Sequence, residues 1–423
     1  MERIKGVTSL VKGAVVTPSK RIVAFDLLRG WFLMVVIIDH VELYPSGFDF
    51  LSGRGQLWVS AAEGFFFLSG LLVGMIYRKK ADPQATPGGG MKLVFKKLWG
   101  RALLLYVCAV SLTLFYTAWA LWHGNAEAIK YGAATQLDWA TVWNTLQLKY
   151  VYGWSDFLSY YVTFMVAAPF IVWLLIKQQW RLVVLASVLL WLNQGTQFTH
   201  AWQLIFFGGL MTGFYWKQLQ AKVASWKPKT QKIAWRTVVS VAVITMAVSY
   251  INLFVLGNLR NNPDAMASAW GAFLNGWNTI NEAVWLWFDK FTLGPGRIAM
   301  FALWFAAAFL VVQRYAAKIP SSIAKTFTLL GQNSLFVYGT HSIFVFAVHA
   351  YLPKDWGFAF NFAITAAVLA VMVGITYVKV ALKRRSAAIE AAAGGTKLST
   401  FEKVTANLRG AASLLRPVGG RRS

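Results

Sequence analysis

The segment VAFDLLRGWFLMVVIIDHVELY (residues 23–44) is the first long apolar run of the chain, and it contains both Arg29 and His40. A helix turns by about 100° per residue, so after eleven positions it returns to within roughly 20° of the same face. At a rise of about 1.5 Å per residue, the two side chains are about 16 Å apart along the axis. Ionisable side chains are costly in a bilayer and by default mark a functional site. The segment therefore predicts a membrane-spanning helix with a polar stripe that connects two depths of the membrane.

The composition extends this prediction to the whole chain. Of its 423 residues, 57% are hydrophobic, 16% aromatic and only 13% charged, which lies outside the range of soluble globular domains. We expect an all-α integral membrane protein, a bundle of about ten transmembrane helices with both termini cytoplasmic. Ten segments are long enough to cross a bilayer or nearly so: 23–44, 57–77, 98–122, 157–176, 182–198, 202–216, 237–256, 298–312, 327–352 and 358–382.

The net charge of +25 would suggest a nucleic-acid partner in a soluble protein. In this chain, the distribution of the charged residues along the sequence indicates a membrane topology instead. If the N-terminus is cytoplasmic, one side of the membrane receives most of the 41 Lys and Arg residues but only a quarter of the 16 acids. Such a bias is typical of multi-pass proteins of the inner (plasma) membrane. No nucleic acid is needed to explain the charge, and the lipid bilayer is the expected partner.

The chain divides into a cytoplasmic N-terminal segment (1–20), a polytopic membrane domain (21–385) and a basic cytoplasmic tail (386–423). Cys108 is the only cysteine, which excludes an intramolecular disulfide and a cysteine-based metal cluster. No zinc motif or glycine-rich nucleotide loop is present. We therefore expect no metal, and the oligomeric state stays open.

Alternating topology gives each intramembrane polar residue an approximate depth. The same outer level then receives His40, Glu63, Gln203, Arg297 and His341. A histidine titrates near neutral pH and suits general-base chemistry, which favours His40 as a catalytic base. Glu63 either orients that base or a ligand, or it pairs with an outer-level cation; both interpretations stay open.

Arg29 lies at the inner level, where its fork of donors suits a phosphate, a carboxylate or a thioester carbonyl. The alternative is a salt bridge with Asp26, three positions earlier on the helix. Ser69 forms a small-residue step near mid-membrane, and Lys79 and Lys80 belong to a cytoplasmic basic cluster. That cluster either attracts an anionic cofactor or serves only as a positive-inside signal.

Acceptor binding is predicted at the outer level, at Trp202, Gln203, Arg297, Tyr338 and His341. The two long outer connections are also rich in tryptophan. Aromatic rings combine apolar area with a polar handle, so they suit a sugar or an amphiphilic acceptor. The alternative is an interfacial aromatic belt.

Five segments resemble the membrane-bound acyltransferases of the acyltransferase-3 type, and most closely the OpgC family, which succinylates periplasmic glucans. They are DLLRGWFLMVVIIDH (26–40), EGFFFLSGLLVG (63–74), AWQLIFFGGLMTG (201–213), DKFTLGPGRI (289–298) and LGQNSLFVYGTHSIFV (330–345). The first contains the arginine and histidine spacing of the family, and together the five extend over nearly the whole membrane domain.

The resemblance implies an O-acyltransferase that moves an acyl group from cytoplasmic acyl-CoA to a hydroxyl of an extracytoplasmic glycan or glycolipid. His40 would be the base and Arg29 would hold the donor, which would be succinyl-CoA or acetyl-CoA. A proton-coupled transporter or flippase of an envelope precursor remains the alternative, because intramembrane Arg, His and Glu residues also occur in proton pathways. A third possibility is a catalytically silent scaffold of the same fold.

Overall fold

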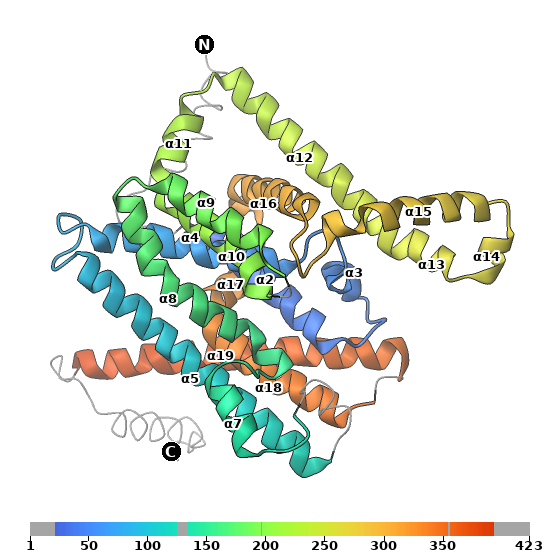
Figure 1. The fold of residues 1–423 in the computed structure, drawn as a ribbon, viewed down its shortest axis with the longest axis horizontal. Helices are drawn as coiled ribbons and strands as arrows, with labels where there is room; N and C mark the ends of the chain where they lie inside the picture. The colour runs from blue at the N-terminus through green and yellow to red at the C-terminus, as the bar shows by residue number, and fades with distance from the viewer. Residues whose placement is uncertain (1–21, 125–133, 196, 354–355, 393–423) are drawn as a thin grey trace, which may run out of the picture.

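The computed structural model describes residues 22–124, 134–195, 197–353 and 356–392, and within these ranges the chain is helical without any strand (Figure 1). The α-helices are α2 (Val23–Val41), α3 (Asp49–Ser52), α4 (Ala61–Ala81), α5 (Met91–His123), α7 (Trp139–Leu146), α8 (Asp156–Ile176), α9 (Trp180–Leu192), α10 (Phe198–Phe214), α11 (Trp216–Ala224), α12 (Pro228–Tyr250), α13 (Gly257–Arg260), α14 (Pro263–Ala267), α15 (Gly271–Phe288), α16 (Pro295–Tyr315), α17 (Ser321–Gln332), α18 (Ser334–Tyr351) and α19 (Gly357–Ala392). Short 3-10 turns η1 (Gly53–Gly55), η2 (Gly153–Ser155) and η4 (Ala316–Lys318) and the π-helix η3 (Ile251–Leu256) connect some of them.

Six helical stretches in the described ranges are long and apolar enough to cross a membrane, so the chain is a membrane protein. They are Ala61–Ala81, Met91–His123, Gly153–Ile176, Pro228–Arg260, Pro295–Lys318 and Gly357–Ala388. Each corresponds to one of the ten segments predicted from the sequence. The two termini lie outside the described residues, so their predicted cytoplasmic location stays a prediction.

The other four predicted spans are also helical but less regular. α2 has 19 residues, and its three charged residues set it apart from an ordinary span. α9 and α10 have only 13 and 17 residues. The predicted span 327–352 is not one helix, because Asn333 interrupts it between α17 and α18. The Asn333 amide donates to the Leu329 carbonyl at 2.9 Å, a local bond that competes with helix continuation.

Glycines set the closest helix contacts. Each of α4 and α10 carries two glycines four residues apart, Gly70 and Gly74 on α4 and Gly209 and Gly213 on α10. A β-carbon at any of the four would lie within 2.2 Å of a backbone oxygen of the other helix. Small residues at this spacing allow membrane helices to approach backbone to backbone. The α4–α10 pair thereby forms a rigid seam that fixes α4 against the bundle.

α2 lies near the middle of the molecule and packs against α4, α16, α17, α18 and α19 (Figure 1). A second glycine seam joins it to α17: a β-carbon on Gly30 would meet the Phe327 carbonyl oxygen at 2.0 Å, and one on Gly331 would meet the Asp26 carbonyl oxygen at 2.1 Å. Both Arg29 and His40 are therefore carried by a helix whose backbone lies directly against that of α17.

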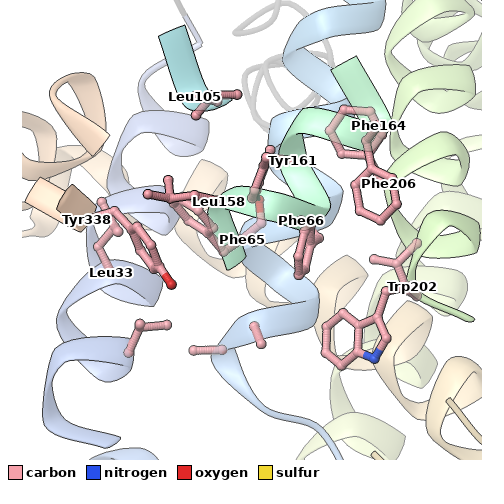
Figure 2. Packing of buried hydrophobic residues seen from close by; sticks show 14 of the residues in the cluster. Leu33, Phe65, Phe66, Leu105, Leu158, Tyr161, Phe164, Trp202, Phe206 and Tyr338 are labelled. Carbon is pink, nitrogen blue, oxygen red and sulfur yellow. Dashed lines mark hydrogen bonds between the residues drawn. The ribbon is translucent and has the colours of Figure 1, made fainter. Parts of the chain in front are cut away.

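The interior next to α2 is built largely from aromatic rings (Figure 2). Phe66 of α4 stacks on Phe157 and Tyr161 of α8, with ring centroids 4.4 and 4.8 Å apart, and it also contacts Trp202 of α10 at 5.3 Å. Phe66 and Trp202 are fully buried. These contacts fix α8 and α10 relative to α4.

Candidate functional site

His40 and His341 meet at the C-terminal end of α2. His40 Nδ1 lies 2.9 Å from His341 Nε2, which comes from α18. His341 is fully buried, whereas His40 keeps partial solvent exposure. A third histidine fixes the backbone at this point, because His349 Nε2 donates to the His40 carbonyl oxygen at 2.9 Å. The structure thus brings together two residues that the sequence had placed at one depth but in different roles.

Arg29, in the first half of α2, faces α4 and α8. Its Nη2 donates to the Ser69 hydroxyl at 3.3 Å, and the Tyr161 hydroxyl donates to the same oxygen at 2.8 Å. The guanidinium lies 5.4 Å from the centroid of the Phe65 ring, within cation–π range. Arg29 Nε is buried without a hydrogen-bond partner among the described residues.

No carboxylate in the described part of the chain lies within ion-pair distance of Arg29. Asp26, the partner considered from the sequence, accepts instead from the Gln332 amide at 2.9 Å. An unpaired guanidinium with an unused donor in a low-dielectric interior is unfavourable. It therefore favours an anionic or carbonyl ligand at this position.

A narrow crevice of about 20 Å³ adjoins Arg29. A second arginine, Arg101 of α5, lines it together with Tyr161, Ser334 and Tyr338. Ser334 is the first residue of α18, so a helix N-terminus, where the macrodipole is positive, also borders the crevice. The crevice is electropositive and opens at the level predicted for the donor.

The crevice does not extend to His40. Phe157 and Tyr338 are among its lining residues, and their ring centroids are 5.7 Å apart. Phe65 stacks on Tyr338 at 6.3 Å, and Figure 2 shows both rings between α2 and α8. The Arg29 guanidinium thus contacts α4, whereas the His40 ring contacts α18, and the crevice beside Arg29 is not lined by His40.

A charged cluster borders His40 near the C-terminal end of α2. Asp39 and Lys290 both approach Gly55: a β-carbon there would lie 3.4 Å from an Asp39 carboxylate oxygen and 3.5 Å from the Lys290 ammonium nitrogen. Lys290 also interacts electrostatically with His40 and with Asp156 at the start of α8. Carboxylates accept from hydroxyl groups and an ammonium group donates to them, so this cluster suits a polyol.

The segment that carries Lys290 is firmly held. The Trp202 indole donates to the Lys290 carbonyl oxygen at 3.1 Å. The Asp289 carboxylate accepts from the Thr292 backbone at 2.7 Å and from its hydroxyl at 2.6 Å, and the Trp191 indole donates to the Thr292 carbonyl oxygen at 3.1 Å. These bonds fix the Lys290 backbone beside the histidine pair.

Glu63 and Arg297 form a buried ion pair, with exposed side-chain fractions of 0% and 3%. Arg297 Nε donates to Glu63 Oε1, while Glu63 Oε2 accepts from the Ser60 backbone at 3.0 Å and from its hydroxyl at 2.6 Å. Of the two interpretations of Glu63, the structure shows the pairing with an outer-level cation. The pair connects the start of α4 to the start of α16.

Trp202 and Gln203, two further predicted site residues, lie on α10. Trp202 is fully buried and stacks on Phe198 at 4.7 Å. The Gln203 amide donates to the Ser187 and His200 carbonyl oxygens at 2.7 and 3.1 Å. Both side chains pack within the bundle and connect α10 to its neighbours.

Tyr338 and the two lysines occupy different levels. The Tyr338 side chain borders the Arg29 crevice, and its carbonyl oxygen contacts His341 Nδ1. Lys79 and Lys80 belong to the last turn of α4, at the predicted cytoplasmic end. Lys79 is exposed, and the Lys80 ammonium lies 5.0 Å from the Tyr77 ring centroid.

Sequence reasoning missed Tyr161, Arg101, Asp156 and Lys290 as members of the site. Lys290 lies within one of the five family-like segments, 289–298. This position could have indicated a functional role for Lys290. Tyr161 and Arg101 are ordinary residues of apolar spans whose role emerges only when α5 and α8 are placed beside α2. Within the described ranges, no group of three or more His, Cys, Asp or Glu side chains is arranged to hold a metal ion.

A much larger cavity, of about 440 Å³, lies elsewhere. It is lined mainly by apolar side chains, including Leu28, Trp31 and Val35 of α2. By helical periodicity these residues occupy the face of α2 opposite Arg29 and His40. The cavity is therefore separate from the polar site.

Comparison with known proteins identifies the family. The model of the family described as OpgC protein matches residues 21–384 of this chain. No curated protein and no solved structure matches it.

Proposed function

The chain belongs to the OpgC protein family, and from this premise and the geometry around His40 we propose that it is an integral-membrane O-acyltransferase of the inner membrane. It moves an acyl group, succinyl rather than acetyl, from cytoplasmic acyl-CoA to a hydroxyl of an extracytoplasmic glycan or glycolipid. Family membership indicates a membrane-associated function in glucan modification. The observation that carries the proposal is the contact between His40 and His341 beside the Asp39 and Lys290 cluster.

In the proposed reaction, the acyl-CoA enters from the cytoplasm with its acyl end toward Arg29, and the crevice of about 20 Å³ there must widen to admit the pantetheine arm. The Arg29 guanidinium, unpaired by any carboxylate in the described residues, donates to the amide or thioester carbonyls of the donor. The rings of Phe65, Phe157 and Tyr338 line this crevice and pack on one another, so they must shift for the donor to enter and for the thioester to reach His40.

On the outer side, Asp39, Asp156 and Lys290 bind hydroxyl groups of the acceptor. His40 removes the proton from the attacking hydroxyl, whose oxygen forms the new bond to the thioester carbonyl carbon. The carbon–sulfur bond breaks, and the proton passes from His40 to the sulfur of the departing CoA. The products are an acyl ester and free CoA.

Glu63 was one reason to consider a proton-coupled transporter. Its carboxylate is paired with Arg297 and hydrogen-bonded to Ser60, so it is not free to carry protons. This observation removes part of the motivation for the transporter.

The test uses purified full-length protein in lipid nanodiscs with labelled succinyl-CoA or acetyl-CoA and a glucan oligosaccharide. The wild type is expected to release CoA and to label the glucan, more with succinyl-CoA. His40→Ala is expected to lose transfer, because general-base catalysis contributes about 10²- to 10⁴-fold. Arg29→Ala is expected to lose transfer because it removes the group that holds the donor. His123→Ala is the matched control, since His123 is exposed at the outer end of α5 and remote from the site. Undiminished transfer in both site variants would overturn the assignment, and solute movement without CoA release would favour the transporter.

A further inference from the structure

Both ring nitrogens of His341 have partners. Its Nδ1 contacts the carbonyl oxygen of Tyr338, one turn earlier in α18, and its Nε2 faces His40 Nδ1 at 2.9 Å. A carbonyl oxygen only accepts hydrogen bonds, so the hydrogen in the first contact belongs to His341 Nδ1. In a neutral imidazole the other nitrogen then has no hydrogen. His341 Nε2 is therefore an acceptor.

The same reasoning assigns the hydrogen on His40. Because His341 Nε2 accepts, His40 Nδ1 donates, and a neutral His40 keeps its lone pair on Nε2. No hydrogen bond to that nitrogen occurs within the described ranges. The buried His341 thus lies behind a partly exposed His40 whose second nitrogen is free for chemistry.

We propose that His341 is a positioning residue that holds His40 as an Nε2 base, and that it does not bind the acceptor as predicted from the sequence. This inference rests on the proposed acyltransferase function. In the reaction, the hydroxyl proton of the acceptor moves to His40 Nε2 as the carbon–oxygen bond forms. It then leaves to the CoA sulfur as the carbon–sulfur bond breaks. His40 Nδ1 keeps its hydrogen bond to His341 throughout.

A histidine in this position acts as the orienting carboxylate does in hydrolase triads, where a partner holds the base in the correct tautomer and supports its cationic form. A neutral imidazole does this without adding a buried charge, which would be costly in a membrane interior. The backbone is fixed independently by the bond from His349 to the His40 carbonyl oxygen. The fixed backbone and the oriented ring together place Nε2 in one direction.

Two substitutions at His341 separate its two contacts. The amide nitrogen of Asn occupies roughly the place of Nδ1, so His341→Asn keeps the bond to Tyr338 but does not reach His40. The longer Gln places its amide near Nε2, so the carbonyl oxygen of His341→Gln accepts from His40 Nδ1. We expect the Asn variant to lose about 100-fold or more in kcat, with the KM for the acceptor unchanged. The Gln variant should retain about a tenth or more of wild-type kcat, because it conserves the acceptor.

The measurement is steady-state transfer from labelled acyl-CoA to a glucan oligosaccharide in nanodiscs, with melting temperatures to check folding. A raised acceptor KM with unchanged kcat in the Asn variant would overturn the proposal and restore acceptor binding. Wild-type kcat in the Asn variant would also overturn it. Neither result would affect the acyltransferase function, which is tested by wild-type turnover and by His40→Ala.

A second measurement does not depend on variants that retain activity. In protein labelled with ¹⁵N-histidine and reconstituted in membranes, solid-state NMR distinguishes protonated ring nitrogens from unprotonated ones. We expect His40 to show a protonated Nδ1 and an unprotonated Nε2, and His341 to show the same tautomer, with assignments from His40→Gln and His341→Gln. A protonated Nε2 on His40 at neutral pH would contradict the proposal.

Discussion

The buried pair of Glu63 and Arg297 is expected to be structural, and substitutions separate this role from catalysis. Glu63→Gln keeps an oxygen that accepts from Ser60 but removes the charge that Arg297 faces. Arg297 is 3% exposed, and among the described residues its Nη1 donates to the Leu57 and Phe288 carbonyl oxygens at 3.3 and 3.2 Å, while its Nη2 has no hydrogen-bond partner. Removing one partner of a buried ion pair typically costs about 3–5 kcal/mol, since the other charge stays buried. We therefore expect a melting temperature lower by roughly 5 °C or more.

The double variant Glu63→Gln with Arg297→Met removes both charges. It should be more stable than either single variant, with a coupling energy of about 1–3 kcal/mol. Unfolding of the nanodisc-embedded protein, followed by intrinsic tryptophan fluorescence, gives the melting temperatures. Transfer of labelled acyl groups is measured on the same samples.

Two results would contradict this reasoning. If the losses in melting temperature of the two single variants add up to that of the double variant, the interaction between Glu63 and Arg297 contributes nothing to stability. If the double variant is as stable as the wild type but transfers no acyl group, Glu63 takes part in the chemistry, as the sequence suggested. Recovery of both stability and transfer would establish a purely structural role.

Three further predictions test the neighbouring features. Gly213→Leu should prevent stable folding, because a β-carbon at Gly213 would lie 1.9 Å from the Leu71 carbonyl oxygen. Yield and monodispersity in detergent measure this effect. Wild-type values of both would contradict the close contact between α4 and α10. Tyr161→Phe removes the hydroxyl that bonds Ser69 at 2.8 Å and should raise the KM for acyl-CoA by up to about tenfold, the value of a typical hydrogen bond; an unchanged KM would separate this contact from donor binding. Lys290→Met should raise the acceptor KM by about tenfold or more, since hydrogen bonds to charged groups are worth about 1.5–3 kcal/mol. Lys290→Arg keeps the charge and should raise the acceptor KM less. The same acceptor KM in both variants would exclude a contact between Lys290 and the acceptor.

The sequence predicted the helical membrane class correctly because hydrophobic runs of membrane length are rare outside membrane-spanning helices. It also placed His40 and His341 at one depth, since depth follows from counting residues along alternating spans. The break at Asn333 was missed, because its cause is a local side-chain bond within an otherwise continuous apolar run.

Lateral contacts were harder to predict than depth. Counting residues along a span does not tell which helices are neighbours, so Glu63 was not assigned a specific partner. The structure shows that α4 and α16 start side by side and that Glu63 and Arg297 pair there. For the same reason Trp202 was expected to contact an acceptor, whereas it packs within the bundle and holds the Lys290 backbone.

Arg29 connects ligand binding to stability: a ligand that binds its guanidinium should raise the free energy of unfolding of the whole protein. Without a donor molecule, the protein bears the cost of a partly buried cation that no carboxylate within the described ranges pairs with at ion-pair distance. A bound anion that relieves this cost stabilises the native state by RT ln(1 + [L]/Kd), about 2.7 kcal/mol at a hundredfold excess over Kd. Thermal shift with CoA derivatives is therefore a direct binding assay for this protein, even in variants that no longer turn over.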